Sequence, residues 1–340
     1  MQKHNHMIDM MRFFAALIVV LFHLNQAVQH VDNWYRNLVK YGWLGVPMFF
    51  VISGYCIILS AYNSGNVKDF LSRRFFRIFP PYWVSIIIVL FAACFQKLYI
   101  GSSAVHYIPR NITDILATFT LTTTPFTNIN TMNWVYWTLT CELFFYLSVC
   151  LILLFSKNFM VYFLIAISLL AVVLPPQKIG LLFFLDQWPA FGLGVCIYYF
   201  FKGSNAISRL YFATLLLINL FNLFHRFYFT DYTIAALLTF CLIFVSHYIK
   251  SSANIFSKLG QHSYSVYLIH VPVGVYIIGL FESKYIQQNA FLNFIYDLTV
   301  YAFISLLAWL IYNRVEKPSI AYGREISTMY FNGKPQKHTA

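Results

Sequence analysis

Long apolar runs separated by short polar segments make up most of this sequence. The runs are about 20 residues long, which is the length of α-helix that crosses the hydrocarbon core of a bilayer. They lack the alternation of apolar and polar positions that is typical of strands, and lipid admits only helices or closed barrels. The pattern therefore predicts an all-α bundle of about ten transmembrane helices. The predicted spans are 12–30, 43–61, 78–97, 133–155, 159–175, 179–201, 210–228, 232–249, 263–281 and 295–313.

The two ends of the chain set the predicted domain organisation. The first apolar run looks like a signal peptide but has no convincing cleavage site and is followed directly by polar residues, so we expect an uncleaved helix. The residues after Glu316 show no periodic apolar pattern. We therefore expect residues 1–316 to form one transmembrane domain and residues 317–340 to form a cytoplasmic tail. The longest connection, 98–132, is polar and rich in threonine, and we expect it on the extracytoplasmic side.

Composition and charge agree with a membrane protein. Of the 340 residues, 60% are hydrophobic and 10% are charged, whereas soluble domains have about 25% charged residues. The net charge of +12 arises from basic residues that flank the apolar runs, so we expect contacts with anionic lipids and none with nucleic acid. Most of the 23 Lys and Arg residues fall on the side that holds both termini, which are therefore predicted to be cytoplasmic. The six cysteines stand singly, so neither a disulfide framework nor a metal site is expected.

The first apolar run carries a cation at one end and an imidazole near the other. In RFFAALIVVLFH, Arg12 and His23 lie on one helix face, about 16 Å apart. Asp9 lies three residues before Arg12, at the spacing of an ion pair that would orient the guanidinium. Ionisable groups inside a span are functional hypotheses by default. The structural alternative is that Arg12 anchors the helix at the headgroups and that His23 is a core histidine with satisfied hydrogen bonds.

A carboxyl group lies near the middle of the predicted span 133–155. Glu142 must be protonated, paired or hydrated there, because a bare charge is costly in hydrocarbon. Tyr146 follows one turn later, and Trp134 and Trp137 offer rings that stack against a sugar or an adenine. The structural alternative for Glu142 is an ion pair.

The stretch QHSYSVYLIHVPV carries a third polar group. His270 lies in mid-span with Tyr267 one turn before it, and Ser263 and Tyr264 stand at the cytoplasmic end. Hydroxyl-rich helix faces often bind helices to one another, so a structural role is the alternative for the hydroxyl residues. Asp186 adds a further acid within a span.

Three arginines cluster just before the third predicted span. In KDFLSRRFFRIFPPYW, Arg73, Arg74 and Arg77 precede Pro80-Pro81, which is expected to reset the backbone as the span begins. Guanidinium groups make bidentate contacts with phosphate, so the cluster suits a ligand with several phosphates. Ordinary anchoring at the headgroups is the alternative. The sequence has no evident Gly-rich phosphate loop, so hydrolysis of a nucleoside triphosphate is not expected.

Taken together and in this order, these stretches resemble the acyltransferase 3 family of multi-pass membrane enzymes, which modify bacterial surface glycans. The resemblance extends over about residues 7–318. The opening motif of the family, an Asp, an Arg and a His eleven residues after the Arg, matches IDMMRFFAALIVVLFH. The further matching stretches are GWLGVPMFFVISGY, RRFFRIFPPYW, WTLTCELFFY, LGQHSYSVYLIHVPV and VEKP.

The resemblance implies a reaction and roles for the polar residues. Acyl-coenzyme A, most often acetyl-coenzyme A, would bind from the cytoplasm, and its acyl group would pass to a hydroxyl of a surface polysaccharide or of a lipid-linked saccharide precursor. His23 would take the proton of the attacking hydroxyl or carry the acyl group itself. The predicted site residues are His23, Glu142 and Arg12 for catalysis, Arg73, Arg74 and Arg77 for donor binding, and Asp9, Trp137, Tyr146, Tyr267 and His270 in supporting positions or at the acceptor site.

The implied setting is the bacterial inner membrane, where membrane lipids surround the chain and a homo-oligomer is compatible with the sequence. Because the thioester of the donor is already activated, no permanently bound cofactor or metal is expected.

Two other function classes stay open at this point. In a transporter, Glu142, Asp186, His23 and His270 would form a proton or solute pathway. The phosphate-suited arginines and the lack of visible repeats argue against that class. The other class is a scaffolding subunit that has lost catalysis, and the retained His23, Arg12 and Glu142 argue against it.

Overall fold

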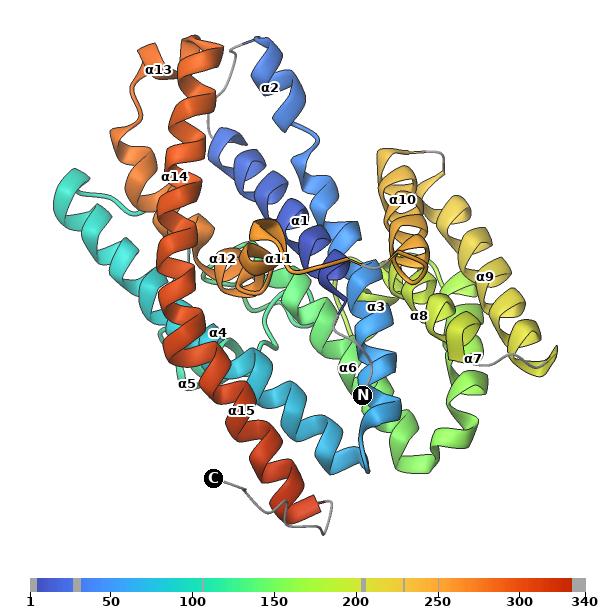
Figure 1. The fold of residues 1–340 in the computed structure, drawn as a ribbon. Coiled ribbons are helices and arrows are strands. Elements are labelled where there is room, and N and C mark those ends of the chain that lie inside the picture. The colour runs from blue at the N-terminus through green and yellow to red at the C-terminus, as the bar shows by residue number, and fades with distance from the viewer. Residues whose placement is uncertain are drawn as a thin grey trace.

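The computed structural model describes residues 5–26, 32–105, 107–202, 206–228, 230–249 and 251–331. Within these ranges the chain forms helices and loops and no strand, as predicted (Figure 1). The α-helices are α1 (His6–Gln26), α2 (Trp34–Val39), α3 (Gly45–Asn63), α4 (Val67–Ile100), α5 (Ile112–Phe119), α6 (Tyr136–Phe155), α7 (Met160–Val173), α8 (Trp188–Lys202), α9 (Ala206–Phe227), α10 (Asp231–Ser246), α11 (Ile255–Gly260), α12 (Ser263–Ile269), α13 (Lys284–Gln288), α14 (Ala290–Ile311) and α15 (Lys317–Ile326). Short 3₁₀ segments are η1 (Gly42–Leu44), η2 (Lys157–Phe159), η3 (Phe183–Asp186) and η5 (Ile278–Phe281), and π-helical segments are η4 (His270–Ile277), η6 (Tyr312–Glu316) and η7 (Ser327–Phe331).

The helices support a multi-pass membrane protein. Among the described residues, 7 helical segments are long and apolar enough to cross a membrane, and two shorter apolar segments, Lys157–Val173 and Asp231–Ser246, accompany them. Each predicted span contains a helix, although the end of the span 12–30 lies outside the described residues. The count of ten spans and the cytoplasmic placement of the termini stay predictions.

The helices at the centre of the bundle pack closely because small residues stand where they meet. α3 packs against α8, and α1 packs against α3 and α11. A Cβ atom on Gly54 of α3 would lie 2.0 Å from the carbonyl oxygen of Phe191, and one on Gly194 of α8 would lie 2.0 Å from that of Val51. No side chain fits at either position, so the two backbones touch.

α4 departs from the predicted third span. The span was expected to begin at residue 78, with Pro80-Pro81 resetting the backbone, but the helix begins at Val67 and continues through both prolines. Proline removes a backbone N–H donor inside a helix. α4 packs against α6, α12 and α15. The helix thus continues within a packed bundle where the local signal favours a break.

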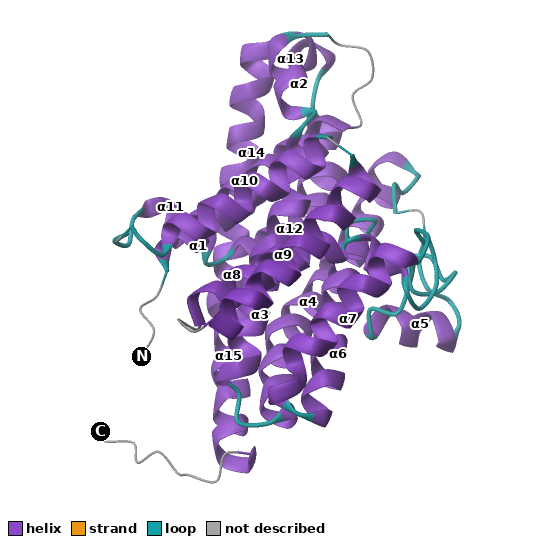
Figure 2. Cartoon of the chain, turned by 90° about the vertical axis from the view of Figure 1, so that its right-hand side faces the viewer, coloured by secondary structure: helices purple, strands orange, loops and turns teal. Residues whose placement is uncertain are grey.

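The segment after α4 is not a loop confined to one surface. Gly101 ends α4 with a left-handed backbone (φ 73°), and the chain then turns back along the same helix. The hydroxyl of Tyr82 donates to the carbonyl of Thr118 (2.6 Å), and the indole N–H of Trp83 donates to that of Phe119 (3.0 Å). Because Tyr82 lies about 27 Å before the end of α4, the end of α5 lies beside the middle of α4. Figure 2 shows α5 at the edge of the molecule.

Residues 317–331, which begin the predicted tail, are helical. α14, η6, α15 and η7 form one helical segment, Ala290–Tyr330, and α15 packs against α4. A Cβ atom on Gly323 would lie 2.8 Å from the Cβ of Phe76, and the rings of Phe76 and Tyr322 lie 5.2 Å apart. The domain boundary at residue 316 stays a prediction, and the helix passes through it. Residues 332–340 of the predicted tail lie outside the described residues.

Candidate active site

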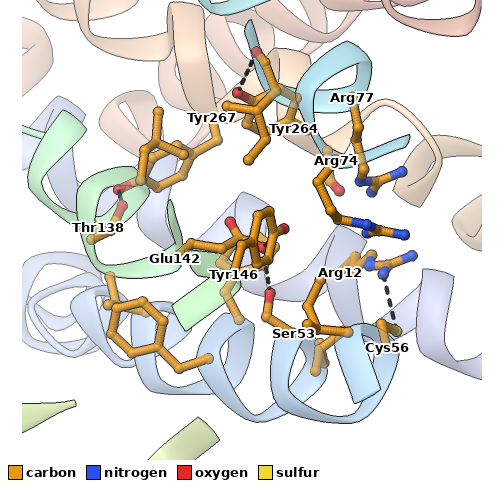
Figure 3. Close-up of a pocket in the computed structure, with 18 residues that line it drawn as sticks. Arg12, Ser53, Cys56, Arg74, Arg77, Thr138, Glu142, Tyr146, Tyr264 and Tyr267 are labelled. Carbon is orange, nitrogen blue, oxygen red and sulfur yellow. Dashed lines mark hydrogen bonds between the residues drawn. The ribbon is translucent and has the colours of Figure 1, made fainter. Parts of the chain in front are cut away.

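A cavity of about 200 Å³ lies between α1, α3, α4, α6 and α12. Figure 3 shows Arg12, Arg74 and Arg77 on one side of it and Thr138 with Tyr267 on the opposite side. Apolar residues of α3 and Leu139 of α6 line the rest of the wall together with a few hydroxyl groups. The cavity therefore has a cationic end and an interior in which apolar and hydroxyl-bearing side chains are mixed.

Arg12 lies at the cationic end and is held from two sides. Its Nη1 donates to Asp9 Oδ1 (3.1 Å), which confirms the predicted pair, and its Nη2 donates to Cys56 Sγ (3.3 Å). Asp9 is buried and does not line the cavity. Asp9 thus orients the guanidinium from behind.

Arg74 and Arg77 come from adjacent turns of α4. Nη2 of Arg74 donates to Ser60 Oγ (2.7 Å), and its guanidinium lies 5.8 Å from the centre of the Tyr146 ring. Arg77 lies in the field of two carboxylates, Glu316 and Glu142. Both arginines line the cavity, as expected for donor-binding residues.

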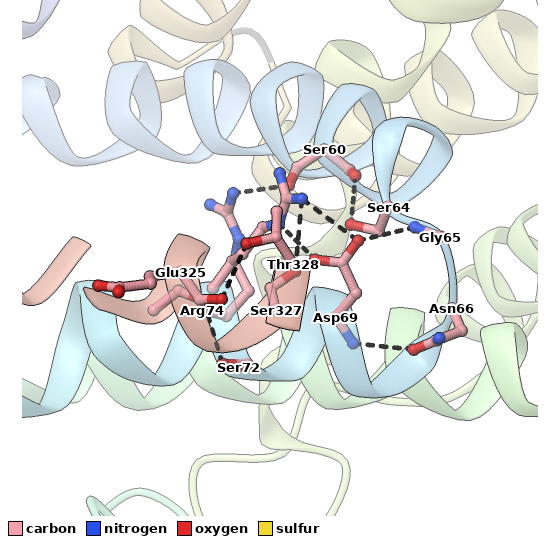
Figure 4. A network of polar contacts seen from close by, with 12 residues as sticks. Ser60, Ser64, Gly65, Asn66, Asp69, Ser72, Arg74, Glu325, Ser327 and Thr328 are labelled. Atoms are coloured by element: carbon pink, nitrogen blue, oxygen red, sulfur yellow. Dashed lines mark hydrogen bonds and ion pairs between the residues drawn. The ribbon is translucent and has the colours of Figure 1, made fainter. Parts of the chain in front are cut away.

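Arg73, which was predicted to bind the donor together with Arg74 and Arg77, does not line the cavity. Its Nε donates to Asp69 Oδ1, and its Nη2 lies 3.3 Å from Asp69 Oδ2 and 3.5 Å from Ser327 Oγ. Asp69 is fully buried and also accepts from the backbone N–H of Gly65 (2.7 Å). Figure 4 shows Asp69 beside Ser327 in this network. The i,i+4 spacing of Asp69 and Arg73 turns the guanidinium toward the C-terminal helix.

Glu142 lies in the cavity wall between the two ends. Its Oε1 accepts from Ser53 Oγ (2.8 Å) and from Tyr146 Oη (2.5 Å). Among the described residues Glu142 makes no direct salt bridge, although its charge acts on Arg77. Ser53 and the buried Glu316 were not predicted as site residues, although both lie in stretches that resemble the family, FFVISGY and VEKP.

His23 and His270 form a pair outside the cavity lining. His23 Nδ1 and His270 Nε2 lie 2.9 Å apart, and their rings stack with centroids 5.0 Å apart. The Tyr267 ring lies 5.4 Å from that of His270, and its hydroxyl bonds to Thr138 Oγ1 (2.6 Å) at the cavity wall. Trp134 approaches His23 edge-on at 6.3 Å. The pair therefore lies behind Tyr267, at the end of the cavity away from the arginines.

Trp137 and Asp186 lie outside the site. Trp137 packs edge-on against Phe50 at 6.3 Å and does not line the cavity. Asp186 forms an ion pair with Arg226 (2.6 Å), whose guanidinium also donates to the carbonyl of Leu174 (2.7 Å). Asp186 thus has a structural partner, which weakens the transporter hypothesis that needs it as a pathway residue.

Comparison with known proteins agrees with this geometry. Residues 5–314 match the sequence model of the acyltransferase domain family Acyl_transf_3. The chain belongs to this acyltransferase family. It is therefore an enzyme that transfers acyl groups.

Individual relatives carry related names. The chain is 24% identical over 332 residues to the O-acetyl transferase of Shigella phage Sf6, covering 91% of this chain and 94% of that protein. It is 32% identical over 145 residues to acyltransferase MdmB of Streptomyces mycarofaciens, covering 41% of this chain and 36% of that one. It is 33% identical over 100 residues to the peptidoglycan O-acetyltransferase OatA of Listeria monocytogenes, covering 28% of this chain and 14% of that one. No solved structure matches the chain.

Proposed function

We propose that the protein moves an acyl group, acetyl in the first instance, from cytoplasmic acyl-coenzyme A to a hydroxyl of a surface polysaccharide or of a lipid-linked saccharide precursor in the bacterial inner membrane. The observation that carries the proposal is the gathering of Arg12, Arg74 and Arg77 at one end of a cavity. At the other end, Tyr267 lines the cavity and its ring lies against that of His270. The relatives named O-acetyl transferase and peptidoglycan O-acetyltransferase support the choice of an acetyl group and a glycan hydroxyl.

The cationic end suits the phosphates of coenzyme A. Three guanidinium groups there offer a set of charge-assisted donors, and a polyanion bound there makes several such bonds. The slender pantetheine arm then runs through the interior, past the hydroxyls of Ser53 and Tyr146 that donate to Glu142. This path delivers the thioester to the Tyr267 end of the cavity.

The chemistry at that end requires a base. The acceptor hydroxyl attacks the thioester carbonyl carbon, a C–O bond forms, and the hydroxyl proton passes to His23. The C–S bond then breaks, and the same proton passes to the sulfur, so that the products are an ester and free coenzyme A. A histidine suits both transfers because its pKa is ordinarily near neutrality.

Tyr267 separates the cavity from His23 in this structure, so the proposal includes a movement of its side chain. The ring lines the cavity, while His23 does not. Its hydroxyl bonds to Thr138 Oγ1 and to the carbonyl of Val135 (2.9 Å). Binding of the donor would exchange these bonds for contacts with the thioester end, which opens the way to the pair.

A transfer assay tests the proposal directly. The purified protein in bilayer discs is given coenzyme A carrying a labelled acetyl group and glycans of a bacterial envelope, with His23→Ala alongside. We expect label in a base-labile ester on the glycan with the intact protein and none with the variant. Unchanged transfer by folded His23→Ala would contradict the assigned base. Saturable solute uptake without donor turnover would favour a transporter.

A further inference from the structure

A continuous line of contacts runs from a backbone carbonyl through both histidines. His270 Nδ1 lies 2.7 Å from the carbonyl oxygen of Tyr267, and its Nε2 lies 2.9 Å from His23 Nδ1. Among the described residues, His23 Nε2 has no hydrogen-bond partner. The line therefore begins at the carbonyl oxygen of Tyr267, which can only accept a hydrogen bond. It ends at Nε2 of His23, which makes no hydrogen bond within the described residues.

His270 reaches back to the carbonyl of Tyr267, three residues before it in the chain. Tyr267 lies in α12 and the π-helix η4 begins at His270, so this contact spans the junction of the two segments.

The protons follow from the contacts. A carbonyl oxygen only accepts, so Nδ1 of His270 carries a proton. His270 is buried and has no carboxylate hydrogen-bonded to it in the described part of the chain, so the neutral ring leaves a lone pair on Nε2. The contact with His23 then needs a proton on Nδ1 of His23, because two lone pairs or two protons would repel at 2.9 Å.

We infer that His270 is a positioning residue that keeps the proton of His23 on Nδ1 and leaves its Nε2 as the base. The inference rests on the proposed function, since it assigns the reacting nitrogen of the same site. When Nε2 takes the proton of the acceptor hydroxyl, His23 becomes an imidazolium. His270 Nε2 stabilises that charge by accepting the bond from Nδ1. His270 itself neither gains nor loses a proton, and it acts as the carboxylate does behind the histidine of a serine-protease triad.

The first test reads the tautomer without any turnover. Protein labelled with ¹⁵N in its histidines, in bilayer discs, is examined by solid-state NMR, with resonances assigned through His23→Gln and His270→Gln. We expect His23 to carry its proton on Nδ1 in the intact protein. In His270→Ala we expect it to shift to the Nε2–H form that predominates in isolated imidazole. A proton on Nε2 of His23 in the intact protein would overturn the inference.

The second test is kinetic and separates positioning from folding. We expect His270→Ala to lower kcat by about 10²- to 10⁴-fold, because the proton of His23 then occupies Nε2, the nitrogen that acts as the base. KM for acetyl-coenzyme A should stay the same, because the donor-binding residues are unchanged. His270→Gln should recover part of the loss, since its amide oxygen accepts from Nδ1–H. Full kcat in His270→Ala would sink the inference.

His247→Gln is the matched control. His247 Nδ1 also lies against a backbone carbonyl, that of Ile243 (2.9 Å), but its Nε2 bonds to Tyr55 Oη (3.0 Å) and not to a second histidine. We expect its kcat to be unchanged. If His247→Gln lowered kcat as much as His270→Ala does, loss of any buried histidine would be enough to lower kcat. That result would overturn the positioning role of His270. If the intact protein transfers label and His23→Ala does not while His270→Ala is fully active, the proposed function stands and the positioning role falls.

Discussion

The two ends of the cavity are built on opposite principles. At the cationic end, Arg12, Arg74 and Arg77 come from two helices, and each has its own neighbours, so several groups share one task. At the other end, His23 and His270 depend on one contact of 2.9 Å and on a single carbonyl. Under the proposed function, donor binding is therefore distributed over several groups, whereas proton transfer depends on one geometry. Substitutions at the two ends should therefore fail in different ways.

The largest effect is expected from removing the base. His23→Ala should lower kcat by about 10²- to 10⁴-fold, the range that a general base contributes. The dissociation constant of acetyl-coenzyme A should stay the same, because the proposed function places the phosphates at the other end. Stopped-assay kinetics and equilibrium binding on the same preparation check this. A variant that loses donor binding together with kcat would break the proposed division between the ends.

A graded effect is expected at the cationic end. Arg74→Ala and Arg77→Ala should each weaken acetyl-coenzyme A binding by about 10- to 100-fold, since a hydrogen bond to a charged group contributes about 1.5–3 kcal/mol. Neither should change kcat at saturating donor. Isothermal titration and saturation kinetics measure the two quantities.

A truncated donor sharpens this result. Acetyl-pantetheine lacks the nucleotide phosphates, so the penalty of the arginine variants should disappear with it. Arg73→Ala is the matched control, because Arg73 pairs with Asp69 and does not line the cavity. A binding loss in Arg73→Ala as large as in Arg74→Ala would contradict the assignment.

A smaller effect, on stability alone, is expected at the contact between α4 and the C-terminal helix. Asp69→Asn removes the charge that Arg73 faces and weakens the bonds at a fully buried position. We expect a loss of about 1–3 kcal/mol, seen as a lower midpoint of thermal unfolding in detergent. Asn293→Ser, at a buried position away from this contact, controls for burial. A changed KM for the donor with unchanged stability would place Asp69 in the binding site instead.

The smallest effect concerns a carboxyl group outside the spanning segments. Burial, with the nearby Asp297 carboxylate, raises the pKa of Glu282 from 4.5 to about 7. The folded state therefore favours the protonated acid, so this stabilisation is complete below pH 4.5 and is lost as the pH rises through about 7. Because the group is partly exposed, we expect roughly 1 kcal/mol.

Thermal unfolding of the intact protein and Glu282→Gln at pH 5 and pH 8 checks this. The glutamine variant should lose that part of the pH dependence while the pH profile of kcat, which reports the histidine end, stays the same. An altered kcat profile in Glu282→Gln would link Glu282 to the reaction.

Much of the architecture could be predicted because it follows from local patterns. Each apolar run became a helix, since an α-helix satisfies its own backbone in lipid. The Asp9–Arg12 pair followed from i,i+3 spacing on one helix. Arg74, Arg77, Glu142 and Tyr146 were predicted from residue type and do line one cavity.

The misplacements share one cause, which is competition from distant partners. Arg73 has the same residue type and segment as Arg74, but Asp69 and Ser327 hold it elsewhere. The Pro80-Pro81 pair predicted an interruption, yet α4 continues because its packing outweighs a local preference. Residues 317–331 were predicted to belong to a tail, yet they are helical, and α15 packs against α4.

The sequence by itself determined the all-helical membrane class, the family, and the residue types of the site, because each depends on composition, on spacing along one helix or on the order of motifs. Only the tertiary structure decided that Arg12 meets Arg74 and Arg77 at one end and that His23 meets His270 behind Tyr267. His23 and His270 are 247 positions apart in the chain. The contact between His23 Nδ1 and His270 Nε2 depends on how far α1 is shifted along η4 and how the two helices are rotated. Tertiary packing sets the shift and the rotation.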